Sequence, residues 1–361
     1  MRSIGMDVHQ KQTVFEVREA SGEVVERGKI STETEALQAI ARRHGKEGVQ
    51  VAIEASTPAF WIRDALMEVG ARVEVTNPYK LRLIAESRSK TDMNDAAILA
   101  ELLRCGGLPK AVYVPAAEIR DLREQLALRR QLIRIRTQLI NRAKATYRRR
   151  GKRYSARAFH TDASWQNGQQ DVSILSSLYQ LWKDIEEQRQ CIESGLASHW
   201  NHDATIQRLR TIPGIGPIVA YTIVAAVGEI SRFKSAEKLA SYAGLVPSER
   251  SSGESIVRGG ITHQGRSELC GAMVQAAWAV LRTRREDTER LKKPFYKIMF
   301  KRNSQVAIVA VARKLLTIVY QVWKQETVFN GDRVGRNMIT RPMASEIDRG
   351  TVACSTHRVT A

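Results

Sequence analysis

Four acidic residues lie at points of the chain where carboxylates could meet. Asp7 closes the apolar stretch of "IGMDVHQ", Glu54 closes that of "VAIEAS", and Asp92 and Asp95 lie three residues apart in "KTDMNDA". Converging carboxylates repel one another unless cations lie between them, and their hard oxygen atoms favour Mg²⁺ or Mn²⁺. Two such ions can hold the attacking and leaving oxygens of a phosphodiester. The residue types therefore predict a metal-dependent site for phosphodiester chemistry.

The two aspartates also have a purely structural interpretation. Thr91 or Asp92 could cap a helix, with Asp95 in its first turn, where the helix dipole favours negative charge. Asp7 and Glu54 favour the metal interpretation, because acids at the ends of apolar strands are costly to place unless they are solvated, paired or coordinated.

Two glycines in "TIPGIGPIVAYTIVAAVG", residues 211–228, predict a helix-hairpin-helix. Gly214 and Gly216 allow a tight turn whose backbone N–H groups could face a nucleic-acid phosphate. An ordinary helical turn in a core is the alternative. Pro213 and Pro217 frame the glycines and favour the nucleic-acid interpretation.

A serine pair lies in "YAGLVPSERSSGESIVRGGITHQG", residues 242–265. Composition alone predicts a flexible loop here. A serine hydroxyl is a weak nucleophile that needs activation, and His263 is the candidate base nearest in sequence to Ser252.

The N-terminal part, residues 1–115, predicts an α/β domain. Three strands come first, and a helix, a strand, a helix and a strand follow them, which is the order of the ribonuclease-H-like fold. In that fold the first and fourth strands are neighbours, so Asp7 and Glu54 would lie side by side. The predicted strands are 2–8, 13–19, 23–30, 49–55 and 72–78, and the predicted helices are 33–44, 58–69, 79–87 and one that begins at Asp92.

The middle part, residues 116–200, predicts a basic long helix followed by a coiled-coil run. Residues 117–153 hold thirteen Lys/Arg and three Asp/Glu, and so supply +10 of the net charge of +19. Such a concentration is typical of a phosphate-binding surface, for which Arg123, Arg130 and Arg134 are the candidate contacts. After a polar break at 154–171, apolar residues recur three and four apart over 175–196. This run forms either an antiparallel hairpin within the chain or an interface between subunits.

The C-terminal part, residues 201–325, predicts a mostly helical domain with a hinge at 244–265. Residues 326–361 lack periodicity and predict a loosely ordered tail. The four cysteines are widely spaced, which argues against a zinc site or a disulfide framework and fits a reducing cytoplasm. The apolar runs are too short for a bilayer, so we expect no membrane association. With a pI near 10.1, the chain is predicted to bind nucleic acid.

The sequence resembles a known family. "GMDVHQK", "AIEAS", "TNPYK" and "KTDMNDA", in this order and spacing, are similar to blocks of the DEDD-type transposases of bacterial insertion sequences, family one-ten, also called bridge recombinases. The resemblance implies a RuvC-like N-terminal domain and a bacterial protein associated with the nucleoid. It identifies Asp7, Glu54, Asp92 and Asp95 as the catalytic metal ligands and Ser252 as the nucleophile, with Ser251 as the near alternative.

The family's chemistry implies partners as well. The serine would attack a DNA phosphodiester, and the Mg²⁺ (or Mn²⁺) held by the carboxylates would act with it. The family implies double-stranded donor and target DNA and a structured noncoding guide RNA. Exchange between two duplexes needs four strand cuts, which implies a dimer or tetramer, with 175–196 as a candidate interface. A hydrolytic RuvC-like nuclease acting on DNA junctions and a non-catalytic binding protein are the alternatives.

Overall fold

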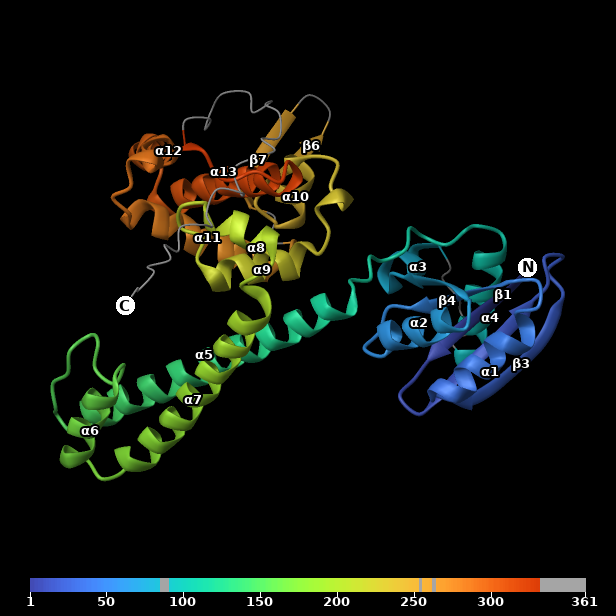
Figure 1. Ribbon diagram of the computed structural model, residues 1–361, viewed down its shortest axis with the longest axis horizontal. Helices are drawn as coiled ribbons and strands as arrows, with labels where there is room; N and C mark the ends of the chain where they lie inside the picture. The colour runs from blue at the N-terminus through green and yellow to red at the C-terminus, as the bar shows by residue number, and fades with distance from the viewer. Residues whose placement is uncertain (85–90, 253–254, 262–263, 332–361) are drawn as a thin grey trace, which may run out of the picture. The chain divides into compact units, whose positions relative to one another are not determined.

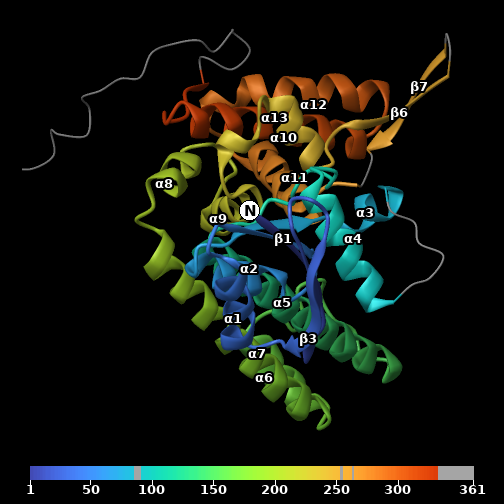
Figure 2. The same ribbon diagram turned by 90° about the vertical axis from the view of Figure 1, so that its right-hand side faces the viewer.

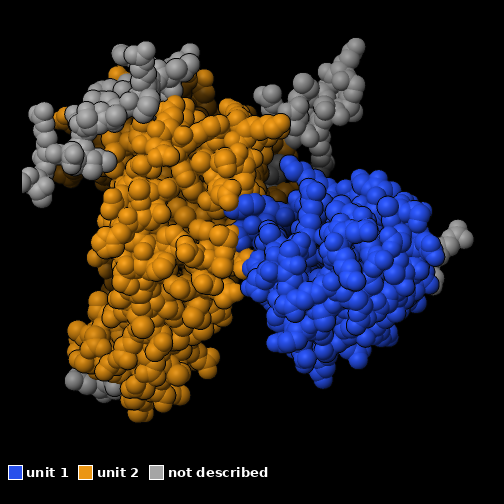
Figure 3. Space-filling view, turned by 45° about the vertical axis from the view of Figure 1, so that its right-hand side comes forward, with its two compact units in different colours: residues 1–115 blue, residues 116–361 orange. Residues whose placement is uncertain are grey.

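The computed structural model describes residues 1–84, 91–252, 255–261 and 264–331, with the backbone alone for residues 169–171, 249–252 and 255–258. The chain divides into two compact units, Met1–Pro115 and Ala116–Ala361 (Figure 3). The divisions predicted at 200/201 and 325/326 fall inside the second unit.

The first unit is built on a five-stranded sheet (Figure 1). Its order is β3-β2-β1-β4-β5, with β1, β2 and β3 antiparallel and β1, β4 and β5 parallel. The prediction that the first and fourth strands are neighbours is confirmed. This mixed α/β arrangement fits a ribonuclease-H-like domain. The strands are β1 Arg2–Val8, β2 Gln12–Arg18, β3 Val24–Ser31, β4 Val49–Glu54 and β5 Arg72–Thr76.

Helices pack on both faces of this sheet. Apolar side chains of β1 and β4 form one core with α1 and α2, because Ile4 and Ile53 are fully buried in the same cluster as Leu37 and Ile62. The opposite face meets α4, where Leu99 packs on Ala52. The helices are α1 Thr34–His44, α2 Ala59–Glu68, α3 Pro78–Ile84 and α4 Asp92–Arg104. Part of the helix predicted at 79–87 lies outside the described residues.

Gly5 lets α4 lie directly against β1. A Cβ atom at this position would stand 2.1 Å from the backbone oxygen of Ala96 and 2.4 Å from the backbone nitrogen of Ala100. Because side chains alternate across a strand, Asp7 points to the same face of the sheet as Gly5. The close approach at Gly5 therefore brings the start of α4 toward Asp7.

Replacing Gly5 with alanine is expected to destabilise the first unit by about 2 kcal/mol or more, because the new methyl group meets backbone atoms that cannot move aside. A loss of that size lowers the melting temperature by roughly 10 °C in a domain of this length. Thermal unfolding followed by circular dichroism measures it. Gly195→Ala is the control, since a Cβ there meets nothing within 4 Å, and an unchanged melting temperature in Gly5→Ala would contradict the packing argument.

The second unit begins with a helical hairpin. α5 Ala117–Arg149 lies along α7 Leu175–Trp200, with α6 Asp162–Asp171 at the far end (Figure 1). The prediction of a polar break over 154–171 is wrong for α6, because Trp165 is fully buried there and packs on Phe159 and Trp182.

The heptad run of α7 packs on α5 of the same chain. Leu175, Trp182 and Leu196 are buried, and ion pairs join the two helices at Arg129–Glu193, 2.7 Å, and Arg136–Glu186, 2.9 Å. Of the two interpretations left open by the sequence, the structure supports the hairpin within the chain.

Helices α8, α10, α11 and α12 pack against α13. Ten of its residues are buried in the core of the unit. By length and composition α13 is the one helix in the described ranges that could cross a membrane, but 61% of its apolar window is buried, which is typical of a core helix. The elements are α8 Ala204–Arg210, α9 Pro217–Val227, η1 Ile230–Arg232, α10 Ala236–Tyr242, β6 Pro247–Ser252, β7 Ser255–Ile261, α11 Ser267–Arg282, η2 Glu286–Thr288, α12 Glu289–Lys301 and α13 Ser304–Lys324.

Two predictions for this region need correction. The expected hinge at 244–265 contains the antiparallel hairpin of β6 and β7, which extends beyond the helices in Figure 2. The first residues of the expected loose tail are held in place, since Glu326 pairs with Arg208 at 3.0 Å and the Phe329 N–H donates to Thr211 Oγ1 at 2.9 Å. Residues 332–361 of that tail lie outside the described residues.

Candidate metal centre and nucleic-acid interface

The strand ends place the first two acids side by side. β1 and β4 run parallel, with Met6 opposite Ile53, so Asp7 and Glu54 follow a directly paired position. Both residues are half-buried. The sheet therefore brings to one edge two carboxylates that are 47 positions apart in the sequence.

The start of α4 presents the other two acids without using them as caps. Thr91 is the N-cap, and its hydroxyl accepts a hydrogen bond from the Asn94 N–H at 3.3 Å. Both parts of the structural interpretation of "KTDMNDA" are confirmed, since Thr91 caps the helix and Asp95 lies in its first turn. The carboxylates of Asp92 and Asp95 remain available for another role.

A histidine that the sequence did not single out joins the cluster. His9 Nε2 lies 3.2 Å from Asp7 Oδ2 and 3.4 Å from Asp92 Oδ2. One potential ligand atom from each of Asp7, His9 and Asp92 falls within 4.8 Å of the others. His9 lies two residues after Asp7, and residues i and i+2 share one face of an extended chain. This spacing is the sequence signal that His9 lies on the same face as Asp7.

The electrostatics show that Asp95 belongs to the same neighbourhood. Burial raises the pKa of the Asp7 carboxyl above its ordinary value; His9 opposes this rise, and the negative charges of Asp92 and Asp95 add to it. A buried carboxylate among other carboxylates is stabilised by a bound cation. Glu54 is not among the three residues of the described chain whose ligand atoms cluster within 4.8 Å.

The spacing of these atoms fits a hard divalent ion. Metal–oxygen distances of about 2.1 Å place neighbouring ligands of an octahedral ion about 3 Å apart. The separations of 3.2 and 3.4 Å around His9 Nε2 are close to that value. The carboxylate oxygens of this set suit Mg²⁺ or Mn²⁺, and the imidazole nitrogen suits transition metals.

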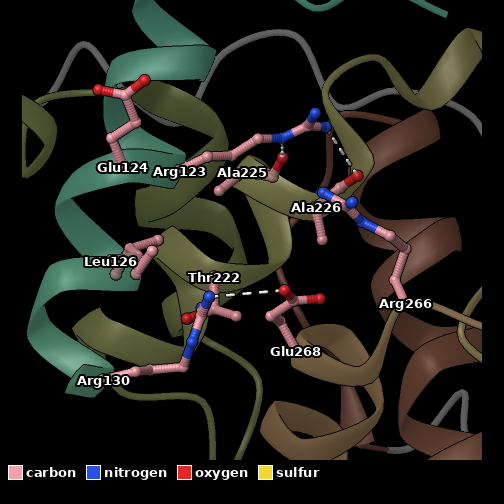
Figure 4. Close-up of a pocket in the computed structure, with 10 residues that line it drawn as sticks. Arg123, Glu124, Leu126, Arg130, Thr222, Ala225, Ala226, Arg266 and Glu268 are labelled. Atoms are coloured by element: carbon pink, nitrogen blue, oxygen red, sulfur yellow. Dashed lines mark hydrogen bonds and ion pairs between the residues drawn. The ribbon is translucent and has the colours of Figure 1, made fainter. Parts of the chain in front are cut away.

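The basic helix α5 uses part of its charge within its own unit. Arg123 donates to the Ala225 carbonyl at 2.6 Å and to the Ala226 carbonyl at 3.3 Å, at the C-terminal end of α9 (Figure 4). Arg130 is exposed and lies 3.5 Å from Glu268, and Arg134 is exposed with a 3.4 Å hydrogen bond to Gln131. The sequence predicted three equivalent phosphate contacts, whereas Arg123 differs from the other two.

A cavity of about 250 Å³ lies beside these arginines. Arg123, Arg130 and Arg266 line it, with Glu268 beside Arg130 (Figure 4). The Nε atom of Arg266 is buried and has no hydrogen-bond partner within the described chain. The sequence offered no signal for Arg266, because its place in the cavity depends on how α11 packs against α5 and α9.

The two glycines of the predicted helix-hairpin-helix have different surroundings between α8 and α9. Gly214 has φ +83°, and a Cβ there would lie 2.4 Å from the backbone oxygen of Ala276, so this glycine packs against α11. Gly216 is the N-cap of α9, and a Cβ there would meet nothing within 4 Å. The open position at the start of the helix is therefore the one at Gly216.

The serine motif lies at the end of a strand. Ser252 is the last residue of β6 and is paired with Ser255, and Ser251 is paired with Ile256. His263, the candidate base, lies outside the described residues.

Comparison with known proteins relates both candidate sites to one family. A family model described as "Transposase IS116/IS110/IS902 family" matches residues 206–292, and a model for IS110-type DEDD proteins, described as "Transposase", matches residues 4–149. One match contains Asp7, Glu54, Asp92 and Asp95, and the other contains Ser252.

Individual relatives cover most of the chain. The pilin gene-inverting protein of Moraxella bovis is 30% identical over 299 residues, which are 80% of this chain and 84% of that protein. The probable family 20 transposase of Pseudomonas aeruginosa is 27% identical over 296 residues, 77% and 85% of the two chains. The transposase for insertion sequence element IS1111A of Coxiella burnetii is 27% identical over 277 residues, 74% and 75%.

Proposed function

This chain belongs to the IS116/IS110/IS902 family of transposases, and on that premise we propose that it cuts and rejoins DNA between a donor and a target duplex through a serine nucleophile and a divalent-metal site. As a transposase it is an enzyme whose substrates are DNA. The meeting of Asp7 and Asp92, with the charge of Asp95 acting on Asp7, carries the proposal.

The carboxylates are proposed to hold the metal. Asp7, Glu54, Asp92 and Asp95 are its ligands, and the two strand ends and the first turn of α4 position them. A bound Mg²⁺ or Mn²⁺ would supply stabilisation of the charge that develops on the phosphate oxygens. A cation would also offset the burial, and the lesser repulsion from Asp92 and Asp95, that raise the pKa of Asp7.

Ser252 is the proposed nucleophile. Its hydroxyl oxygen attacks the phosphorus of a DNA strand, the bond to the 3′-oxygen breaks, and the hydroxyl proton passes to that oxygen. This step leaves a phosphoserine link and a free 3′-hydroxyl. The 3′-hydroxyl of another strand then attacks the same phosphorus and returns a proton to the serine. Each step exchanges one phosphodiester for another, so rejoining needs no ATP.

The basic face of α5 is proposed to hold nucleic acid, including a structured noncoding guide RNA that pairs with donor and target. Phosphates dominate affinity for either polymer. Arg130 and Arg134, which are exposed, and the start of α9 at Gly216 are the proposed contacts. Exchange between two duplexes needs four strand cuts, which implies a dimer or tetramer. The contacts between its subunits would use surfaces other than the apolar face of α7, because that face is buried against α5.

Replacing Arg130 and Arg134 together with alanine is expected to weaken binding of RNA and DNA and to lower the slope of log affinity against log salt by about 2. Fluorescence anisotropy at several salt concentrations measures this slope. Arg123→Ala is the matched comparison. The Arg123 side chain donates hydrogen bonds to two carbonyls of the protein. Arg123→Ala should therefore lower the melting temperature and leave the salt slope nearly unchanged. Equal slopes for wild type and the double variant would rule out the phosphate contacts.

A hydrolytic nuclease acting on DNA junctions is the second candidate, since a carboxylate cluster alone suffices to activate water. The test combines the purified chain, its element's noncoding RNA, Mg²⁺ and end-labelled donor and target DNA. Rejoined recombinant strands that require the metal support the transposase reaction. Cut strands that are never rejoined would favour the nuclease.

A further inference from the structure

We propose that His9 is a ligand of the divalent ion at the carboxylate centre, which makes this a mixed oxygen–nitrogen site that prefers Mn²⁺ to Mg²⁺. The inference rests on the proposed function, because it takes the carboxylates as metal ligands. It adds to them a residue that lies outside the four acids of the motif.

The distances around the imidazole match the spacing of ligands on one ion, and without metal the same proximity makes His9 a side-chain hydrogen-bond partner of Asp7. Charge-assisted hydrogen bonds between nitrogen and a carboxylate are typically about 2.7–2.9 Å long. His9 Nε2 lies at 3.2 Å from Asp7 Oδ2 and at 3.4 Å from Asp92 Oδ2. Ligand atoms that share one ion lie about 3 Å apart or more. One nitrogen placed almost equally far from two oxygens has the spacing of neighbouring ligands.

The backbone fixes His9 at this point. The His9 N–H donates to the Gln12 carbonyl at 3.0 Å, across the turn between β1 and β2. The hydroxyl of Thr32 donates to the His9 carbonyl at 2.9 Å. The side chain is 52% exposed, whereas that of Asp7 is 15% exposed. His9 therefore stands on the solvent side of the buried carboxylate, where an ion enters.

The nitrogen donor sets the metal preference. Mg²⁺ is bound mainly by oxygen ligands and keeps several of its waters. Imidazole suits later divalent ions, and affinity for a given site rises along the first transition row. An imidazole beside two carboxylates therefore adds more to the binding of Mn²⁺ than to that of Mg²⁺.

Electron paramagnetic resonance of Mn²⁺ bound to the full chain, without nucleic acid, tests the assignment directly. Wild type is expected to show the hyperfine coupling of a directly bound nitrogen, and the coupling should change when histidine is labelled with ¹⁵N. His9→Gln should lose it and bind Mn²⁺ about tenfold more weakly or worse, a change that loss of a metal-site residue commonly produces. Its affinity for Mg²⁺ should change less.

Asp92→Asn is the matched variant, because it replaces the charged carboxylate beside the same nitrogen with a neutral amide. If wild type binds Mn²⁺ without nitrogen coupling, or if His9→Gln binds it equally well or more tightly, His9 is not a ligand, and the carboxylate centre stands without it. If wild type binds no Mn²⁺, or if Asp92→Asn leaves binding unchanged, the metal centre itself is absent, and the proposed function fails with the inference.

Discussion

Replacing Asp7 with asparagine is expected to lower the rate of DNA strand cleavage at least about a thousandfold, which corresponds to about 4 kcal/mol of lost transition-state stabilisation. The Asp7 side chain is less exposed to solvent than those of His9 and Asp92, and it contacts His9. The substitution replaces a charged carboxylate ligand with a neutral amide. Cleavage of end-labelled DNA at saturating Mg²⁺ measures the effect, and Asp64→Asn, in α2 and paired with Arg63, is the control.

Unfolding would not explain that loss. Burial raises the pKa of Asp7 in the folded chain, so the stability that this group contributes is present below its ordinary pKa and is lost as pH rises through the raised value. At neutral pH without metal, Asp7→Asn should therefore melt at the wild-type temperature or above it. Divalent metal should stabilise the wild type and raise its melting temperature. At a metal concentration of a hundred times the dissociation constant, the gain in free energy of unfolding is about 2.7 kcal/mol. The melting temperature of Asp7→Asn should rise much less. Near wild-type cleavage by the variant would contradict the metal assignment.

Replacing Ser252 with alanine is expected to abolish the covalent protein–DNA link and strand exchange, leaving only background. Removing a nucleophile takes away the covalent pathway entirely, and losses of about a millionfold are known for such changes. The measurement is a denaturing gel of end-labelled DNA, on which a protein-linked strand migrates slowly.

Ser251→Ala is the matched control. Ser251 and Ser252 are consecutive residues of β6 and carry the same hydroxyl group, so the two single variants differ only in which position loses it. If Ser251→Ala loses the link and Ser252→Ala keeps it, the nucleophile is Ser251. If the double variant still recombines DNA fully, no serine of this motif attacks.

The strand order could be predicted because hydrophobic alternation and turn residues mark each strand of the first unit. Asp7 and Glu54 could be placed together once the first and fourth strands were taken as neighbours. The two-residue spacing from Asp7 could indicate the side of the strand on which His9 lies, but not its distance from the carboxylates. His9 follows the end of β1, and its direction depends on the turn to β2 and on the hydrogen bond from Thr32.

Other features depend on packing that no local pattern records. The need for glycine at position 5 arises from the backbone of α4, about ninety residues later in the chain. Arg123 belongs to a basic run, yet it bonds carbonyls of α9 because α5 and α9 pack together. The polar composition of 154–171 concealed α6, whose stability comes from the buried rings of Trp165 and its neighbours.

Mapping the covalent link to a residue tests most directly the claim that the serine and the carboxylates act in one reaction. The DNA adduct is trapped on a nicked or mismatched target, digested with protease, and analysed by tandem mass spectrometry. We expect a nucleotide on Ser252, formed with Mg²⁺ or Mn²⁺ and absent both in chelator and in Asp7→Asn. An adduct that forms equally without metal, or strand cleavage that proceeds with no modified serine at all, would contradict it.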